Sequence, residues 1–589
     1  MNIESTKSKL KDVFIASDQE VDNNEKYSRD GQLTKKKLIE YLPAMMVTNI
    51  SVLLLVTVDG LVVGNLVNEN ALSSVNVIYP AVSFLGIASI LVATGISTSI
   101  SRQMGKGDQM ALRRLKNAGL KLMLIVAVII SLLQIPAFYF IIDSYHLKGE
   151  LLDMTWAYSI GIMLTTPFGL VSTVGVYQLQ IIGKMKILAT LAVTEGIVNL
   201  VFDLLFVGVF KMGVAGAGYG TAAASIVRCI ITVIFLIKKT DVYNSGGVKG
   251  TGEDIKNILT CGLPECSYSV MSAIQAYLFM HIVLSYMPDD GGAIRGVCTF
   301  CYTLVYIFIS GVVGSMRPLA GLLSGANDTR GLRILVKQCL NMCIVLIGIA
   351  TVIIELIPWL FFWIHGVKDP TDLGISSLRI YGINFIFSGI NSVFLLYFSN
   401  RKDTKFATTL TVVGNATLPL FAYIFGSVIG PAWIWFSYTV MNIMILTVYI
   451  RRYLGWIQKD KENDDPNSKT LYMTVKAEEA IEASRYIRNY AQENDFPLRV
   501  ANRASLCMEE MAAYAKQSQK NDELLIQIIV KFTKDEVFFM MLDTGECIAL
   551  DEDKDVQKLT TDNYELIKRL SKSVEYQYLL NMNYTRIVV

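Results

Sequence analysis

The feature that most constrains this chain is a series of long apolar runs between residues 41 and 450. A helix that spans a membrane needs about 20 mostly apolar residues. Runs such as residues 71–100, 122–142 and 154–183 contain no Asp, Glu, Lys or Arg at all. The sequence therefore predicts a polytopic α-helical membrane protein with twelve transmembrane helices. The predicted spans are residues 41–66, 71–100, 122–142, 154–183, 187–210, 212–237, 258–287, 296–325, 338–364, 373–399, 406–429 and 431–450.

Composition agrees with this interpretation. Charged residues make up 18% of the 589 residues, whereas an ordinary soluble chain carries about 25%. The mean hydropathy of +0.43 excludes a wholly soluble enzyme. A net charge of +2 does not indicate a nucleic-acid partner, and with three His no metal site is predicted. Residues 1–37 are polar and do not resemble a secretory signal peptide.

Lys and Arg are concentrated in the N-terminal segment and in the even-numbered loops between the predicted spans. The odd-numbered loops contain few of them. Because basic loops stay in the cytoplasm, we expect a multi-pass protein of the cytoplasmic membrane with both termini in the cytoplasm. The basic segments are residues 35–37, 102–121, 184–186, 238–239, 330–337 and 401–405.

Two short motifs recur at an offset of about 220 residues. Leu42-Pro43 and Leu263-Pro264 open spans one and seven, whereas Gly105-Lys-Gly-Asp108 and Gly325-Ala-Asn-Asp328 close spans two and eight. The repeat predicts two six-helix lobes: an N-lobe at residues 38–240 and a C-lobe at 241–455. Parallel repeats are a known transporter plan, with the substrate site between the halves.

Acidic residues inside spans are rare and mark function by default. Asp59 lies in span one, and Glu195, Asn199 and Asp203 lie in span five at i, i+4 and i+8. That spacing places the three on one face of a helix. A carboxyl group in a dry helix bundle can bind and release a proton at working pH. The alternative is that these acids form structural pairs or reach the membrane surface.

The second half does not repeat these acids, so we expect cation coupling in the first half. The C-lobe candidates are Glu265, directly after Pro264, and His281, which titrates near neutral pH. A neutral His281 hydrogen-bonded inside the bundle is the structural alternative. Arg228 and Arg317 lie toward predicted cytoplasmic ends, where we expect both side chains to extend to the membrane surface.

Across residues 38–455 the sequence resembles the MATE (multidrug and toxic compound extrusion) family. The likeness rests on the order and spacing of four segments. They are Val58-Asp59-Gly60-Leu-Val-Val-Gly64, Asn199-Leu-Val-Phe-Asp203, Gly213-Val-Ala-Gly-Ala-Gly and Gly262-Leu-Pro264. The resemblance implies an antiporter that expels organic cations and other amphiphiles by alternating access, driven by a proton or sodium gradient.

The resemblance also implies an N-lobe cation site. An Asp in span one and an Asn and an Asp in span five form that site in similar members, which assigns Asp59, Asn199 and Asp203. Thr221 matches a span-six Thr, and Glu195 shares its helix face. We expect proton coupling, no enzymatic activity, no bound cofactor, a small amphiphilic substrate, a lipid bilayer environment and a monomer. The alternatives are a flippase for lipid-linked precursors and a membrane-anchored signalling kinase.

The tail differs in composition. Residues 456–468 read as a linker, and residues 469–589 as a small cytoplasmic α/β sandwich domain. Its segments around Glu510 and around Asp543-Thr-Gly545 resemble those of histidine-kinase-type ATPases, closest to anti-sigma-factor kinases. The resemblance implies that Glu510 acts as a base, that Asp543 binds the amino group of adenine, and that Gly545 lets the backbone approach the nucleotide closely. Tyr514 replaces the usual magnesium-binding Asn, and residues 555–566 contain no Gly. We therefore expect a degenerate domain that binds ATP weakly or docks a cytoplasmic protein.

Overall fold

The computed structural model describes most of the chain, and the described residues form two compact units. One unit comprises residues 40–328 and 338–450, and the other comprises residues up to 39, 329–337 and 451–589. The described residues are 31–67, 69–240, 246–365, 367, 369–401, 403–462, 469–517, 524–533, 536–545 and 561–589.

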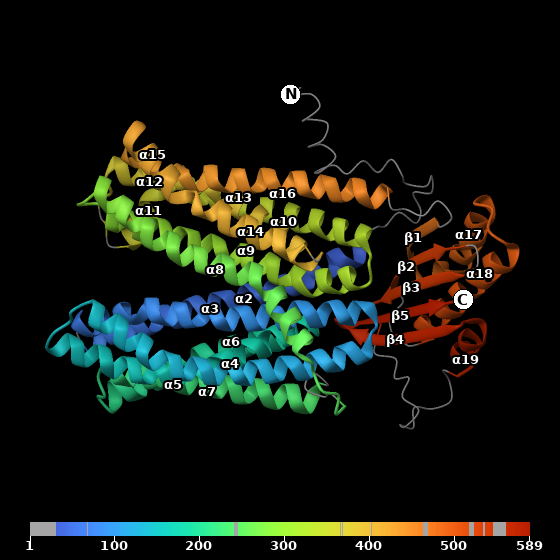
Figure 1. Ribbon diagram of the computed structural model, residues 1–589, viewed down its shortest axis with the longest axis horizontal. Helices are drawn as coiled ribbons and strands as arrows, with labels where there is room; N and C mark the ends of the chain where they lie inside the picture. Colours follow the sequence, from blue (N-terminus) through green and yellow to red (C-terminus); the bar gives the residue numbers. More distant parts are fainter. Residues whose placement is uncertain are drawn as a thin grey trace. The chain divides into compact units, whose positions relative to one another are not determined.

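Long helices dominate the chain (Figure 1). Eleven helices among the described residues are long and apolar enough to cross a membrane. A further helix, α2 (Gln32–Leu66), covers the range predicted for the first span. On α4 (Gln109–Ser144) large apolar side chains such as Leu132 and Phe140 are exposed, 65% and 74% respectively. Exposed apolar surface of this kind is what a lipid-facing helix presents, so the structure supports a multi-pass membrane protein.

The remaining helices of the first half follow the predicted spans closely. The π-helical segment η1 directly extends α6 and was not predicted. The elements are α3 (Glu69–Lys106), α5 (Glu150–Ile181), α6 (Met185–Asp203), η1 (Leu204–Val209) and α7 (Val214–Lys239).

In the second half four predicted spans are interrupted. The ninth breaks at Ile357, the tenth at Ile383 and the eleventh at Thr417, and the twelfth starts with the 3-10 helix η2. A proline lies in the first turn of α15 and of η2, where its missing N–H costs nothing. The elements are α8 (Gly252–Tyr286), α9 (Gly291–Gly325), α10 (Thr329–Leu356), α11 (Pro358–Ile364), α12 (Asp372–Gly382), α13 (Asn384–Asn400), α14 (Thr404–Ala416), α15 (Leu418–Val428), η2 (Pro431–Trp435) and α16 (Phe436–Glu462).

The membrane helices form two groups (Figure 1). Helices α3–α7, the first helix group, pack against one another, and so do α8, α9 and α11–α15, the second helix group. Glycines let α3 cross α8 and α9 at backbone contact. A Cβ added to Gly95 would lie 2.2 Å from the Ile258 carbonyl oxygen, and one added to Gly105 would lie 2.1 Å from the Leu322 oxygen. These contacts join the two groups along the C-terminal half of α3.

The tail contains an antiparallel sheet with strand order β1-β2-β3-β5-β4. Alternate side chains such as Met473 and Ile528 share one buried core with Cys507 and Met511 of α18. The sheet and its helices are consistent with the small α/β domain that the sequence predicts for the tail. The elements are β1 (Lys469–Lys476), η3 (Ala477–Glu479), α17 (Ala480–Glu493), α18 (Leu498–Gln517), β2 (Leu525–Phe532), β3 (Val537–Asp543), α19 (Thr561–Leu570), β4 (Ser573–Leu579) and β5 (Met582–Val588).

Candidate functional site

The polar residues of α6 meet α7 in the interior of the first helix group. Asn199 and Asp203 are completely buried, and Thr221 on α7 is 8% exposed. The Asn199 side-chain amide donates a hydrogen bond to Thr221 Oγ1 at 3.4 Å, and Thr221 Oγ1 donates to the Ala217 carbonyl oxygen at 3.0 Å. The structure therefore brings together three of the residues that the sequence assigned to a cation site.

Gly220 makes room for the carboxylate of Asp203. A Cβ added to Gly220 would lie 2.0 Å from Asp203 Oδ1 and 3.1 Å from the Asp203 backbone nitrogen. Asp203 is also the last residue of α6, where the helix passes directly into η1. Short π-helical segments often occur at functional sites. Gly216, Gly220 and Ala224 form a stripe of small residues along α7, and this pattern did not indicate a role for Gly220 beside Asp203.

Glu195 lies on the same face of α6 but has a cationic partner. Its carboxylate forms an ion pair with Arg228 of α7, and the two side chains are only 8% and 14% exposed. The expectation that Arg228 extends to the membrane surface is therefore wrong. The two side chains are 33 positions apart in the sequence and meet because α6 and α7 pack side by side. The periodicity within one helix does not predict such a contact between two helices.

Asp59 lies within α2, but its side chain falls outside the described residues. The span-one member of the proposed site therefore stays a prediction.

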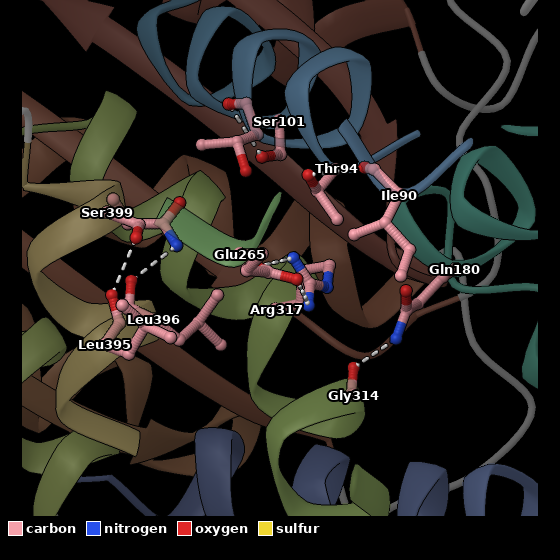
Figure 2. A network of polar contacts seen from close by, with 12 residues as sticks. Ile90, Thr94, Ser101, Gln180, Glu265, Gly314, Arg317, Leu395, Leu396 and Ser399 are labelled. Carbon is pink, nitrogen blue, oxygen red and sulfur yellow. Dashed lines mark hydrogen bonds and ion pairs between the residues drawn. The ribbon is translucent and has the colours of Figure 1, made fainter. Parts of the chain in front are cut away.

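Glu265 belongs to a second buried ion pair. Arg317 Nη1 and Nη2 of α9 donate to Glu265 Oε1 and Oε2 of α8 at 2.6 and 2.9 Å (Figure 2). The Arg317 side chain is 6% exposed and its guanidinium lies 5.0 Å from the ring centroid of Tyr177 on α5. Arg317 therefore does not reach the membrane surface, contrary to expectation.

This ion pair lies where the two helix groups meet. Beside it, Gln180 Nε2 of α5 donates to the Gly314 carbonyl oxygen of α9 at 2.6 Å (Figure 2). The paired fork of Arg317 and Glu265 has the bidentate geometry that makes arginine–carboxylate bonds strong. Arg317 contacts Tyr177 of the first helix group, and together with the neighbouring Gln180–Gly314 hydrogen bond this contact connects the two helix groups.

His281 does not join Glu265. It lies sixteen residues further along α8, which corresponds to about 24 Å of helix. The side chain is exposed, and its ring contacts Tyr277 edge to face with centroids 4.7 Å apart. The two C-lobe candidates are therefore separate features rather than one site.

In the tail, Asp543 ends β3 and is fully buried. Its Oδ1 accepts hydrogen bonds from the Gly545 backbone N–H at 2.8 Å and from Asn583 Nδ2 at 2.7 Å. Its Oδ2 has no hydrogen-bond partner among the described residues. Burial raises the pKa of Asp543 to about 6, although both hydrogen bonds oppose that rise.

The other tail candidates are less well defined. Glu510 lies half-buried on α18. Tyr514 lies in the same helix, but its side chain falls outside the described residues. The side chains of residues 555–565, in the glycine-free segment, also fall outside them. Asn583, which orients Asp543, was not singled out from sequence, because its strand pairs with β3 from 40 positions away.

Parts of this chain are similar to known proteins in sequence and in fold. Residues 44–205 match the MatE family model. The multidrug export protein MepA of Staphylococcus saprophyticus is 22% identical over 339 residues, which cover 56% of this chain and 74% of the relative. MepA of Staphylococcus aureus (strain MSSA476) is 20% identical over 424 residues, which cover 70% and 92%. MATE-family multidrug exporters are secondary transporters and not enzymes.

Solved structures show the same fold. A MOP superfamily transporter from Pyrococcus furiosus superposes with a TM-score of 0.67 at 19% identity, over 74% of this chain and 99% of the other. A multidrug resistance MATE family transporter in the outward-facing conformation gives a TM-score of 0.65 at 20% identity, over 74% and 100%. The solved structures show that the membrane part of this chain has the fold of MATE transporters, and the family model and the relatives agree with that fold.

Proposed function

We propose that this protein is a proton-driven antiporter of the cytoplasmic membrane that exports organic cations or other amphiphilic small molecules. The similarity to multidrug export proteins supports the substrate class. In this proposal residues 38–240 and 241–455 form two lobes that alternate between inward- and outward-open forms around a central substrate site. Both termini lie in the cytoplasm.

The observation that carries the proposal is the buried polar cluster between α6 and α7. Asp203 is fully buried beside Asn199 and Thr221. A buried carboxylate is costly when charged and much less costly when protonated, so proton binding and the local structure are coupled. Substrate entry from the cytoplasm would then favour one protonation state and proton entry from outside the other.

We assign this role to Asp203 rather than to Glu195. Glu195 is already neutralised by Arg228, so a proton or sodium ion binding there must compete with a buried guanidinium. We propose that this pair holds α6 against α7, whereas Asp203, with Asp59 from α2, exchanges the coupling ion. The available energy is about 2.3 kcal/mol per charge per 100 mV and about 1.4 kcal/mol per pH unit.

In the C-lobe we propose a structural role for Glu265 with Arg317 at the junction of the lobes. We propose that His281, exposed on α8, is a separate feature and not part of this pair.

We propose that residues 469–589 form a regulatory domain without catalysis. Support comes from Asp543, which presents a buried carboxylate oxygen at the end of β3 and is held by Asn583. This arrangement suits weak recognition of an amino group such as that of adenine. A cytoplasmic protein is the proposed alternative partner of this domain.

The first experiment measures efflux of fluorescent organic cations from cells, with and without a protonophore. Wild type is compared with Asp59→Asn and Asp203→Asn. Asp143→Asn, which removes an exposed acid outside the cluster, is the matched control. We expect efflux from wild type and from the control, and the protonophore should abolish it in both. The two test variants should show no efflux.

Efflux that survives the protonophore but needs sodium would show that the protein is an exporter and that its coupling ion is sodium instead of a proton. A well-inserted wild-type protein that moves none of the cations would contradict the proposed function and favour transport of a lipid-linked precursor.

A further inference from the structure

A cavity of about 240 Å³ lies where α3 meets α8 and α14. Its walls carry two cations, five neutral hydrogen-bonding side chains and a thiol, and no Asp or Glu of the described residues lines it. A water molecule occupies about 30 Å³ in the liquid, so the cavity has room for a small ion with several waters. The lining residues are Ser99, Arg102, Gln103, Lys106, Asn257, Thr260, Cys261 and Thr404.

Arg102 is a buried cation in the wall of this cavity, 8% exposed. Its Nε donates to the Asn400 carbonyl oxygen at 3.0 Å, its Nη2 donates to the Ser399 carbonyl oxygen, and its Nη1 contacts Cys261 Sγ at 3.4 Å. A guanidinium has five N–H groups, so these bonds leave two for another ligand. Among the described residues none of its partners is a carboxylate.

The charge of Arg102 is therefore only partly balanced. Ser399 and Asn400 end α13, where the helix dipole supplies about half of a negative charge. Taking a full cation out of water costs several kcal/mol unless an opposite charge compensates. Lys106, one turn further along α3, adds a second cation to the same wall. An anion in the cavity would balance the remaining charge of Arg102.

We propose that this cavity binds a phosphate-sized oxyanion, either inorganic phosphate or the phosphomonoester headgroup of an anionic lipid. The spare N–H groups of Arg102 and the ammonium of Lys106 supply charge-assisted hydrogen bonds. Asn257, Thr260 and Thr404 add neutral donors from the opposite wall. A site with several donors and no carboxylate in its lining suits a multiply charged oxyanion better than a cation.

The site also depends on conformation. Arg102 and Lys106 belong to the first helix group, whereas Asn257, Thr260 and Thr404 belong to the second. An ion held by both groups stabilises the form in which these helix ends are together. Within the proposed transport cycle, which this step presupposes, that form is closed toward the cytoplasm. The anion would slow reopening on that side.

The test uses the purified full-length protein and measures binding directly, so it does not depend on transport. Inorganic phosphate and short-chain phosphatidic acid are titrated separately by calorimetry, with chloride as the background anion. Alkylation of Cys261 by a maleimide is followed in parallel by peptide mass spectrometry, because this thiol lines the cavity. Lys106→Gln is the main variant, and Lys121→Gln removes an exposed charge of α4 as the control.

We expect saturable binding of at least one probe and slower alkylation of Cys261 when it is bound. Lys106→Gln should weaken binding about tenfold, the usual effect of losing a charge-assisted hydrogen bond, and Lys121→Gln should not. Arg102→Gln should weaken anion binding further. If Arg102→Gln does not fold, Lys106→Gln alone still tests the proposal.

Binding of phosphate identifies a free ion, and binding of phosphatidic acid alone identifies a lipid headgroup. Binding of neither probe, or equal affinity in wild type and Lys106→Gln, would overturn the proposal.

Discussion

Gly220→Ala should disturb the coupling site more than the fold. The added Cβ would lie 2.0 Å from Asp203 Oδ1. An ordinary van der Waals contact starts at 3.4 Å, so the carboxylate oxygen must move by about 1.4 Å. The Asp203 backbone nitrogen, 3.1 Å from the new Cβ, leaves little freedom on the other side. Asp203 therefore has to change its rotamer.

The expected magnitudes separate stability from transport. Overpacking of a buried site typically costs about 1–3 kcal/mol in the free energy of unfolding. A misplacement of about 1 Å at a reacting group in an enzyme costs about a hundredfold in rate, and we expect proton-driven efflux to fall by at least about tenfold on the same reasoning. The matched control is Gly216→Ala on the same stripe of α7, where the new Cβ would contact Phe206 at 3.0 Å.

The assays are thermal unfolding in detergent and initial efflux rates at several external pH values. Both variants should lose a similar amount of stability, but only Gly220→Ala should lose efflux and its pH dependence. Efflux from Gly220→Ala that equals that of Gly216→Ala, at all pH values, would refute the claim that the position of Asp203 controls coupling.

Three further results are expected. Glu265→Gln leaves the buried Arg317 unpaired and should lower the free energy of unfolding by about 3–5 kcal/mol, most of which Arg317→Met in the same chain should restore; thermal unfolding measures both. Glu195→Gln should destabilise the fold on the same scale because it strands Arg228, and unchanged stability would show that this pair is not structural. For Asp543 the folded pKa of about 6 exceeds the unfolded value of about 3.9, so tail stability should fall by about 2 kcal/mol as pH rises from 4 to 7. Asp543→Asn should abolish that slope, as followed by hydrogen exchange of the β3 amides in the full-length chain.

The membrane architecture was predictable because its physical requirement is simple. A spanning helix must be long and apolar, and both properties are read directly from residues in a row. The helix breaks at Ile383 and Thr417 were not predictable in this way, because hydropathy is high on both sides of each break.

The candidate site was predictable in part for the same reason. The spacing of Asn199 and Asp203 predicts a shared helix face, but it does not say which helix that face meets. The partners of the buried charges come from distant positions, such as Arg317 for Glu265 and Asn400 for Arg102. The expectation that Arg228 and Arg317 reach the membrane surface considered each residue alone, whereas packing against neighbouring helices buries both side chains.

The most direct test of the account uses proteoliposomes with an imposed pH gradient and a fluorescent organic cation. Wild type should move the cation against its gradient and carry protons the other way, whereas Asp203→Asn should do neither at equal reconstitution and equal thermal stability. Full proton-driven transport by Asp203→Asn would contradict the central claim that this buried carboxyl group exchanges the coupling proton.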